Sequence, residues 1–407
     1  MSNECHGDFL LYQYRTFEGF WSIVQSDSLW LTNARFSNDE EEQTLGLKKI
    51  DSILRHLSVE DTVLNECRKL YCDAYISCFC KECDCLSQWR GYAHNGGVAI
   101  GFDFERDAKF SILASGVSSA TEVKTKSQRV VRDALVRDVE YINLSESLSE
   151  QDIKSKIDDW GICKIDLGNG NASLDEAVSK KLADSIPYIK HAGFKEEHEK
   201  RLVFTNNDRG LDACLRYRKS ESAAIQIPYI VACCGDPLLD ARECVVRTSF
   251  SDISLIADLQ NALDKGNVQC CSPLVFDCLC RAEPDVVEKT DEVCFGCSRK
   301  GNFDIEQRTA ACKGSDIYAL RADDHDIYIS QGKNQKQICE VVRRWLAERK
   351  DTRKVWCEGH LPIRKIVIGP CPNKAEVEES ISYYCKHTYW LQDVEIVVSQ
   401  IPYRQHL

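Results

Sequence analysis

The chain has 407 residues, of which 43% are hydrophobic and 29% are charged. This composition is sufficient for a buried core and excludes wholesale disorder. The formal net charge of -12 disfavours non-specific binding to nucleic acid or to an anionic membrane, because an acidic surface repels phosphate groups.

The N-terminal residues contain no basic stretch followed by an apolar one, so we expect no secretion signal. No segment approaches the roughly 18 consecutive apolar residues that a membrane-spanning helix needs. We therefore expect a cytoplasmic protein without a membrane anchor. In that reducing compartment the 23 cysteines are expected to remain thiols, many of them as small buried hydrophobic residues.

The N-terminal part of the chain alternates short apolar runs with segments of helical periodicity. The pattern predicts strands at 10–14, 28–32, 74–79 and 98–104. It predicts helices at 17–24, 39–57 and 59–71. We expect the strands at 74–79 and 98–104 to pair with each other at the centre of a sheet.

The C-terminal part continues with a helix at 174–189, strands at 199–204 and 224–227, and a helix at 334–348. A strand–helix–strand ending is predicted at 363–368, 374–387 and 394–399. The sequence thus predicts an α+β fold, with a twisted mixed or antiparallel sheet flanked by helices and a cysteine-rich insertion. We predict a main domain at 1–265, the insertion or subdomain at 266–333, and a segment at 334–407 that completes the main domain.

Polar residues near the first strand and the second helix are candidates for binding a phosphate group. Arg15 follows an apolar strand, where a guanidinium can hold a diphosphate through two parallel hydrogen bonds. Its alternative role is a salt bridge to the acidic run at 40–42. Asn38 and Asp39 precede a predicted helix and suit its N-cap. In their alternative role they lie at the rim of a pocket, where helix N–H groups face an anion.

Two aromatic residues, Trp89 and Tyr92, lie three positions apart between predicted core strands. On one helical turn their rings share a face and can stack on a nicotinamide or a base. The alternative is that both rings close the hydrophobic core beneath the loop.

Glu197, Glu199 and Arg201 alternate where a strand is predicted to begin, so they share one face of it. Two neighbouring carboxylates raise each other's pKa unless a cation such as Arg201 neutralises them. Such a cluster suits the stabilisation of an oxocarbenium-like sugar centre, or the binding of a metal ion. The alternative is a solvent-exposed ladder of ion pairs, which contributes little stability.

Four cysteines occupy one short segment: Cys78, Cys80, Cys83 and Cys85. A second pair, Cys294 and Cys297, has the spacing of a zinc knuckle, and Cys357 with His360 offers further ligands. The pair Cys80 and Cys83 in the first segment and the pair Cys294 and Cys297 are much farther apart in sequence than the ligands of common zinc sites. We therefore keep a structural zinc ion as an alternative and favour scattered, reduced cysteines.

Five blocks of sequence occur in the order expected for one known family. They are residues 11–15 (LYQYR), 36–42 (FSNDEEE), 76–102 with ISCFC, QWRGY and GVAIGF, 193–202 (GFKEEHEKRL), and the C-terminal pair 368–370 (IGP) and 399–404 (SQIPYR). In these blocks the chain resembles the bacterial domain-of-unknown-function family 2971. The resemblance implies a standalone bacterial protein and, for some members, a link to antiviral (phage) defence.

A more distant likeness concerns mechanism. The order Tyr-x-Tyr-Arg, then Trp-x-x-Tyr, then Glu-x-Glu-x-Arg is similar to that of ADP-ribosyltransferase toxins. The likeness implies that NAD is the substrate, that an arginine binds its diphosphate, and that an aromatic ring stacks on its nicotinamide. The implied catalytic residues are Glu199, Glu197 and Tyr92. The implied ligand-binding residues are Tyr14, Arg15, Asn38, Asp39, Trp89 and Arg201.

The leading hypothesis is therefore an NAD-consuming transferase that acts on a nucleotide-type small molecule and a protein or nucleic-acid acceptor. One alternative is a non-catalytic sensor that recognises a phage or host protein through the same groove. Another is a metal-dependent nuclease that uses Asp39, Glu197 and Glu199, which the acidic net charge disfavours. The oligomeric state stays open.

Overall fold

The computed structural model describes residues 10–36, 41–56, 74–93, 96–104, 108–134, 136–143, 184–205, 210–220, 224–238, 242–247, 258–259, 262–263, 275–277, 318–323, 326–331 and 335–402. The chain divides into two compact units, which are described separately. Unit 1 comprises Met1–Cys233, Lys365–Lys374 and Val397–Leu407, and unit 2 comprises Cys234–Arg364 and Ala375–Ile396. The domain bounds expected from the sequence stay a prediction.

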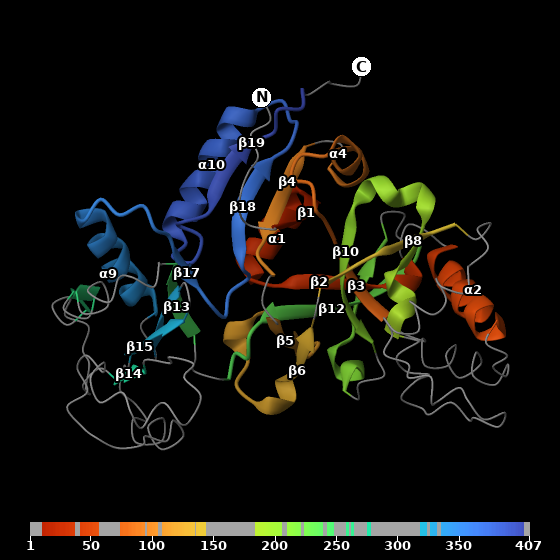
Figure 1. The fold of residues 1–407 in the computed structure, drawn as a ribbon, viewed down its shortest axis with the longest axis horizontal. Helices are drawn as coiled ribbons and strands as arrows, with labels where there is room; N and C mark the ends of the chain where they lie inside the picture. The colour runs from red at the N-terminus through yellow and green to blue at the C-terminus, as the bar shows by residue number, and fades with distance from the viewer. Residues whose placement is uncertain are drawn as a thin grey trace. The chain divides into compact units, whose positions relative to one another are not determined.

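The main sheet has 12 described strands, most of them in unit 1 (Figure 1). They are β1 (Leu11–Thr16), β2 (Leu29–Asn33), β3 (Ala74–Cys80), β4 (Gly97–Phe102), β5 (Ala108–Leu113), β6 (Arg129–Ala134), β7 (Val136–Asp138), β10 (Glu199–Thr205), β11 (Arg216–Lys219), β12 (Gln226–Cys234), β18 (Ile363–Ile368) and β19 (Glu395–Val398). The order is β19-β18-β4-β1-β3-β2-β12-β5-β6, and β10 also pairs with β3. The predicted α+β class is confirmed.

Strand β1 lies between β3 and β4, which were expected to pair directly with each other. It pairs with β4 along its whole length, from Leu11 opposite Phe102 to Thr16 opposite Gly97. The predicted pairing of 74–79 with 98–104 is therefore wrong. Residues 11–14 are all buried, so β1 takes a central place in the sheet even though it comes first in the chain.

The strand β10 lies along β3 over seven residue pairs, from Glu199 opposite Cys80 to Thr205 opposite Ala74. At the same end of β3, Cys80 also faces Tyr12 of β1. Three segments that are distant in sequence thus meet where β3 ends. This junction positions the site described below.

The helices follow the apolar periodicity of the sequence. Helix α1 (Phe17–Ser26) begins after Thr16, whose side chain accepts a hydrogen bond from the Gly19 amide, and it buries Phe20, Ile23 and Val24 on one face. Helix α2 spans Glu41–His56 and helix α4 spans Leu86–Tyr92. The predicted helix at 59–71 lies outside the described residues.

The end of the predicted helix at 174–189 is wrong in the part that the structure describes. Residues Ile186–Tyr188 form a 3₁₀ turn, and Ile189–His191 form strand β9, which pairs with β8 (Glu140–Ile142). Pro187 lacks the amide that a continuing helix needs, which explains the break. A further 3₁₀ segment, Ala192–Glu197, leads from β9 to β10.

Unit 2 contains a second sheet of five described strands in the order β14-β15-β16-β13-β17. They are β13 (Arg242–Arg247), β14 (Val275–Asp277), β15 (Tyr318–Asp323), β16 (Asp326–Gln331) and β17 (Val355–Cys357). Helix α9 spans Gln335–Glu348, as predicted. The predicted strand–helix–strand ending is confirmed as β18, α10 (Lys374–His387) and β19. Of the described helices, none combines the length and the apolar character that crossing a membrane requires.

Candidate functional site

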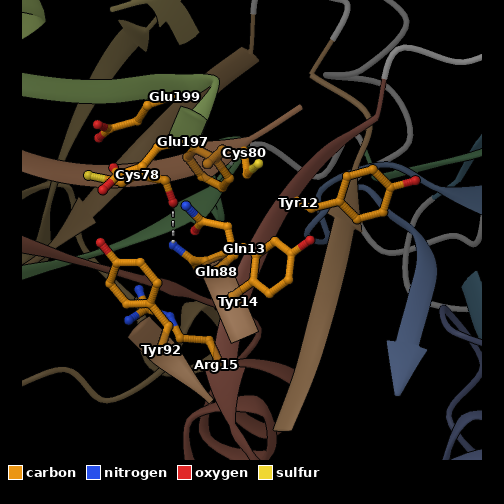
Figure 2. A pocket seen from close by; sticks show the side chains of 11 residues that line it. Tyr12, Gln13, Tyr14, Arg15, Cys78, Cys80, Gln88, Tyr92, Glu197 and Glu199 are labelled. Atoms are coloured by element: carbon orange, nitrogen blue, oxygen red, sulfur yellow. Dashed lines mark hydrogen bonds between the residues drawn. The ribbon is translucent and has the colours of Figure 1, made fainter. Parts of the chain in front are cut away.

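A pocket lies in unit 1 where β1, β3, β10 and α4 meet, and the roughly 400 Å³ of empty space within it includes open solvent. It is lined by Tyr12, Gln13, Tyr14, Arg15, Cys78, Phe79, Cys80, Gln88, Tyr92, Glu197 and Glu199. Figure 2 shows the two carboxylates on one side and Arg15 with Tyr92 on the other, while Tyr12 turns away. The pocket thus has an acidic end and a basic, aromatic end.

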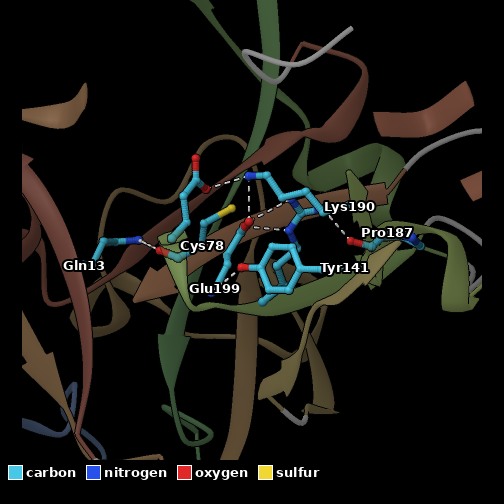
Figure 3. Close-up of polar contacts among 8 residues, drawn as sticks. Gln13, Cys78, Tyr141, Pro187, Lys190 and Glu199 are labelled. Atoms are coloured by element: carbon cyan, nitrogen blue, oxygen red, sulfur yellow. Dashed lines mark hydrogen bonds and ion pairs between the residues drawn. The ribbon is translucent and has the colours of Figure 1, made fainter. Parts of the chain in front are cut away.

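Glu199 is the centre of the acidic end and is 4% exposed. Arg201 Nε donates to its Oε1 at 2.6 Å, and Arg201 Nη2 donates to its Oε2 at 3.1 Å. Lys190 Nζ donates to Oε2 at 2.8 Å (Figure 3). Burial alone would raise the pKa of Glu199, but the two cations outweigh it and lower the pKa to about 2. Glu199 is therefore ionised and held in a fixed position.

Lys190, on β9, connects the two carboxylates of the acidic end. Its Nζ donates to Glu197 Oε2 at 2.7 Å as well as to Glu199, and it lies 5.0 Å from the centre of the Phe194 ring. The Lys190 side chain is 7% exposed and the Glu197 side chain is 18% exposed. Of the two carboxylates, Glu197 is therefore the one more open to a bound molecule.

Backbone groups and a phenol complete the frame of the acidic end. The Tyr141 hydroxyl accepts a hydrogen bond from the Glu199 amide at 2.7 Å. Arg201 Nη1 donates to the Pro187 carbonyl at 2.6 Å. Burial raises the pKa of the Cys78 thiol well above its ordinary value, so Cys78 is a neutral thiol beside Glu199. These contacts fix the geometry without adding net charge.

The basic end depends on Arg15, whose side chain projects from β1. Its buried Nε atom has no hydrogen-bond partner in the described part of the chain. The expected alternative, a salt bridge to the acidic run at 40–42, falls on side chains outside the described residues. Burial lowers the pKa of Arg15 from its ordinary value, because the charged form is desolvated. A guanidinium whose buried Nε donor has no partner among the described residues is suited to bind an anion.

Two further groups face the interior of the pocket. Gln13 lies two residues before Arg15 on the same face of β1, and its amide nitrogen donates to Ser77 Oγ at 2.7 Å. Its Oε1 is buried without a partner among the described residues. Tyr92 is 39% exposed, and burial of its hydroxyl raises its pKa. The pocket therefore offers a cation, a hydrogen-bond acceptor and an aromatic ring together.

Trp89 occupies the core instead of the pocket lining and is 3% exposed. Its ring meets Tyr14 edge-on, with 4.6 Å between ring centres, and its Nε1 donates to Asp84 Oδ1 at 2.7 Å. The Tyr14 hydroxyl in turn donates to the Glu82 carbonyl at 2.7 Å and accepts from the Cys85 amide at 2.9 Å. Trp89 thus takes the core-closing role that the sequence left open.

The sequence-predicted residues divide into three groups. Those that line the pocket are Tyr14, Arg15, Tyr92, Glu197 and Glu199. Arg201 and Trp89 support residues of the lining from behind. Asn38 and Asp39 lie outside the described residues. Sequence reasoning missed Lys190, Gln13 and Gln88, and it considered Cys78 as a zinc ligand and not as part of this pocket. Of these residues, Gln13 carried a usable signal, its two-residue spacing from Arg15 on a strand.

The described residues contain no group of three or more His, Cys, Asp or Glu side chains arranged to hold a metal ion. Between Glu197 and Glu199, the position that a bridging cation would take is filled by Lys190 Nζ. Cys80, Cys83 and Cys85 pack in the hydrophobic cluster around Tyr14 and Trp89. Cys294 and Cys297 lie outside the described residues.

Comparison with known proteins adds one finding. No curated protein and no solved structure matches the chain. Residues 88–202 match the model of a family described as "Protein of unknown function (DUF2971)". The matched segment begins in α4 and ends in β10, so it carries Tyr92, Glu197 and Glu199, while Arg15 precedes it. Over residues 88–202, the chain is therefore similar to the DUF2971 family.

Proposed function

We propose that the pocket binds a nucleotide-type anionic ligand and that NAD is its substrate in an ADP-ribosyltransferase-like reaction. The observation that carries the proposal is Arg15, whose buried Nε has no hydrogen-bond partner among the described residues and which lines the same pocket as an aromatic ring and two carboxylates. The cellular role implied by the sequence resemblance, a phage-defence or toxin effector, belongs to the same proposal.

Binding of an anion at Arg15 is supported by the energetics of burial. A guanidinium removed from water without a partner is costly, and an anionic oxygen recovers much of that cost. A phosphate offers the planar pair of acceptors that a guanidinium binds best. Gln13 Oε1 provides an adjacent acceptor for a donor group of the ligand. A diphosphate that joins two polar groups fits this pattern.

The reaction requires a carboxylate beside the sugar. In NAD cleavage the bond between ribose C1′ and the nicotinamide nitrogen breaks, and its electron pair leaves with nicotinamide. The ribosyl oxocarbenium ion is stabilised by a neighbouring carboxylate, and water or an acceptor side chain then adds and loses a proton. Both oxygens of Glu199 are already bound by Arg201 and Lys190. We therefore assign the stabilising role to Glu197, and we assign to Glu199 the role of orienting Lys190, which contacts both carboxylates.

Tyr92 is the residue best suited to contact the leaving group. Its ring is 39% exposed, and its hydroxyl points toward the acidic end in Figure 2. A half-exposed ring can stack on nicotinamide without unfolding the core, in contrast to the buried ring of Trp89.

A non-catalytic sensor is the second candidate, and one observation favours it. The acidic end is already neutralised by Lys190 and Arg201, as in a structural ion-pair network. In that case the pocket binds its ligand and leaves it intact. The nuclease hypothesis has weaker support, because Lys190 Nζ fills the position between the two carboxylates.

The test combines binding and turnover by the full-length chain. Titration calorimetry with NAD and ADP-ribose measures binding, and chromatography measures nicotinamide release. We expect Arg15→Met to weaken both ligands by about tenfold or more, equivalent to about 1.4 kcal/mol. The control is Arg90→Met, which removes an exposed arginine that does not line the pocket. We expect Glu197→Gln to bind NAD and release no nicotinamide.

Each result bears on one candidate. Binding by the wild-type chain without nicotinamide release, with or without candidate acceptors, supports the sensor and removes the transferase. If neither NAD nor ADP-ribose binds, or if Arg90→Met weakens binding as much as Arg15→Met, the nucleotide pocket is refuted.

A further inference from the structure

Unit 2 contains a buried cluster of three thiols that the pocket in unit 1 does not involve. Cys244 on β13, Cys339 on α9 and Cys357 on β17 are 0%, 0% and 6% exposed. The Cys339 thiol donates to Cys244 Sγ at 3.1 Å, and Cys339 Sγ lies 3.2 Å from Cys357 Sγ. Cys244 and Cys357 face each other as register partners of adjacent antiparallel strands. One central sulfur thus contacts two others.

A cation lies beside this cluster. Arg343, one turn after Cys339 on α9, donates from Nε to Asp393 Oδ2 at 2.7 Å and from Nη2 to the Tyr389 carbonyl at 2.8 Å. Its buried Nη1 has no hydrogen-bond partner in the described part of the chain. Both Cys339 and Cys357 interact electrostatically with this guanidinium. Its positive charge favours the thiolate form of a neighbouring cysteine.

The three cysteines are not equivalent. Hydrogen bonding with the neighbouring Cys244 and Cys339, together with the nearby His360 and Arg343, holds the pKa of Cys357 well below its ordinary value. Burial raises the pKa of Cys244 well above its ordinary value. Cys357 is also the most exposed of the three. Of the three thiols, it is therefore the one best suited to react first with a small oxidant that enters the cluster.

We propose that Cys244, Cys339 and Cys357 form a peroxide-sensitive thiol centre in which Cys357 is oxidised and Cys339 closes a disulfide with it. In the first step the Cys357 thiolate attacks hydrogen peroxide, and Cys357 sulfenic acid and hydroxide form. In the second step Cys339 sulfur attacks Cys357 sulfur, and water leaves. Peroxide is the two-electron oxidant, so two thiols and one peroxide yield one disulfide and two waters.

The geometry requires little movement for the second step. The sulfur atoms of Cys339 and Cys357 are 3.2 Å apart, and a disulfide bond is about 2.05 Å long, so the two atoms must approach by about 1 Å. The bond would join α9 to β17 within unit 2. Cys244 remains as a thiol in contact with Cys339, where thiol–disulfide exchange can move the bond.

Peptide mapping of the full-length chain tests the centre. The folded protein is exposed to hydrogen peroxide, remaining thiols are alkylated, and peptides are identified by mass spectrometry with and without reductant. We expect a reductant-sensitive link between the Cys339 and Cys357 peptides. In Cys339→Ser we expect dimedone labelling of Cys357, because its sulfenic acid then has no adjacent resolving thiol. The matched control is Cys385→Ser on α10, which removes a buried cysteine whose raised pKa has burial as its cause.

Three results would overturn the proposal. The first is oxidation of other cysteines of the folded wild-type chain while the Cys339–Cys357 link is absent. The second is an equally strong Cys244–Cys339 link in Cys357→Ser, which would remove Cys357 from its role. The third is stoichiometric zinc in the purified wild-type chain that Cys357→Ser loses and Cys385→Ser keeps, which would make the cluster a metal site.

Discussion

Replacement of Arg201 by methionine tests whether the acidic end of the pocket is held by a buried ion pair. The substitution keeps an unbranched, apolar side chain and removes two hydrogen bonds to Glu199, at 2.6 and 3.1 Å, and one to the Pro187 carbonyl. Arg201 and Glu199 are 2% and 4% exposed, so water does not replace these contacts. Removal of one partner of a buried pair costs about 3–5 kcal/mol.

The pKa of Glu199 gives a second estimate of the free energy that this ion pair contributes. Its lowering from the ordinary 4.5 to about 2 corresponds to about 3 kcal/mol of preference for the charged carboxylate. Lys190 remains next to Glu199 in Arg201→Met, so we expect a loss of about 3 kcal/mol. In the double variant Glu199→Met, Arg201→Met the buried charge is gone, and we expect recovery of more than half of that loss.

Hydrogen exchange of peptides from β3 and β10 measures the free energy of opening at this position in the fold. The control is Lys81→Met, which removes an ion pair with Asp138 in the same unit whose side chains are 47% and 58% exposed, and which contributes about 0–1 kcal/mol. If Arg201→Met costs no more than this control, the pair does not stabilise unit 1. If the double variant loses as much stability as Arg201→Met and Glu199→Met together, the two residues act independently and the ion-pair explanation is refuted.

Two further predictions concern stability. Because the folded-state pKa of Glu199 is lowered, its contribution to the free energy of unfolding is present above about pH 4.5 and is lost as the pH falls toward 2. The free energy of unfolding in urea should therefore depend less on pH in this range in Glu199→Gln than in the wild-type chain. An unchanged dependence on pH would contradict this prediction. An added Cβ at Gly369 would lie 2.6 Å from Trp89 Cζ3, so Gly369→Ala should cost about 1–3 kcal/mol by thermal unfolding. Gly91→Ala, with no atom within 4 Å of the added Cβ, should stabilise α4 by about 0.5–1 kcal/mol. Equal midpoints for these two variants would refute the close packing of Trp89.

The sequence predicted the elements with strong periodicity well, and it predicted their partners less well. Helix α9 and the β18–α10–β19 ending agree with prediction because apolar positions recur at regular spacing. The pairing of β3 with β4 was wrong because neighbouring strands in sequence were assumed to be neighbours in space. Burial of residues 11–14 is the physical reason that β1 lies between them, and that burial depends on contacts made across the whole sheet.

The candidate site shows the same division. The alternation of Glu197, Glu199 and Arg201 predicted a shared polar face, but the sequence offered a solvent-exposed ladder as its alternative, whereas Glu199 and Arg201 are buried. The difference arises from Lys190, which no local spacing connects to Glu199 and which β9 delivers from the neighbouring segment. A pairwise ion contact between separate strands cannot be read from periodicity.

The two ends of the pocket differ in a way that bears on function. At the acidic end two carboxylates meet two cations, so the charges balance within the protein. At the basic end the buried Nε of Arg15 has no hydrogen-bond partner among the described residues. If such a guanidinium had no anionic partner, an apolar residue of similar volume would be at least as stable at this position, because an uncompensated buried charge is destabilising. The anion proposed at Arg15 would complete this end of the site, and the acidic end would then act on that anion once it is bound.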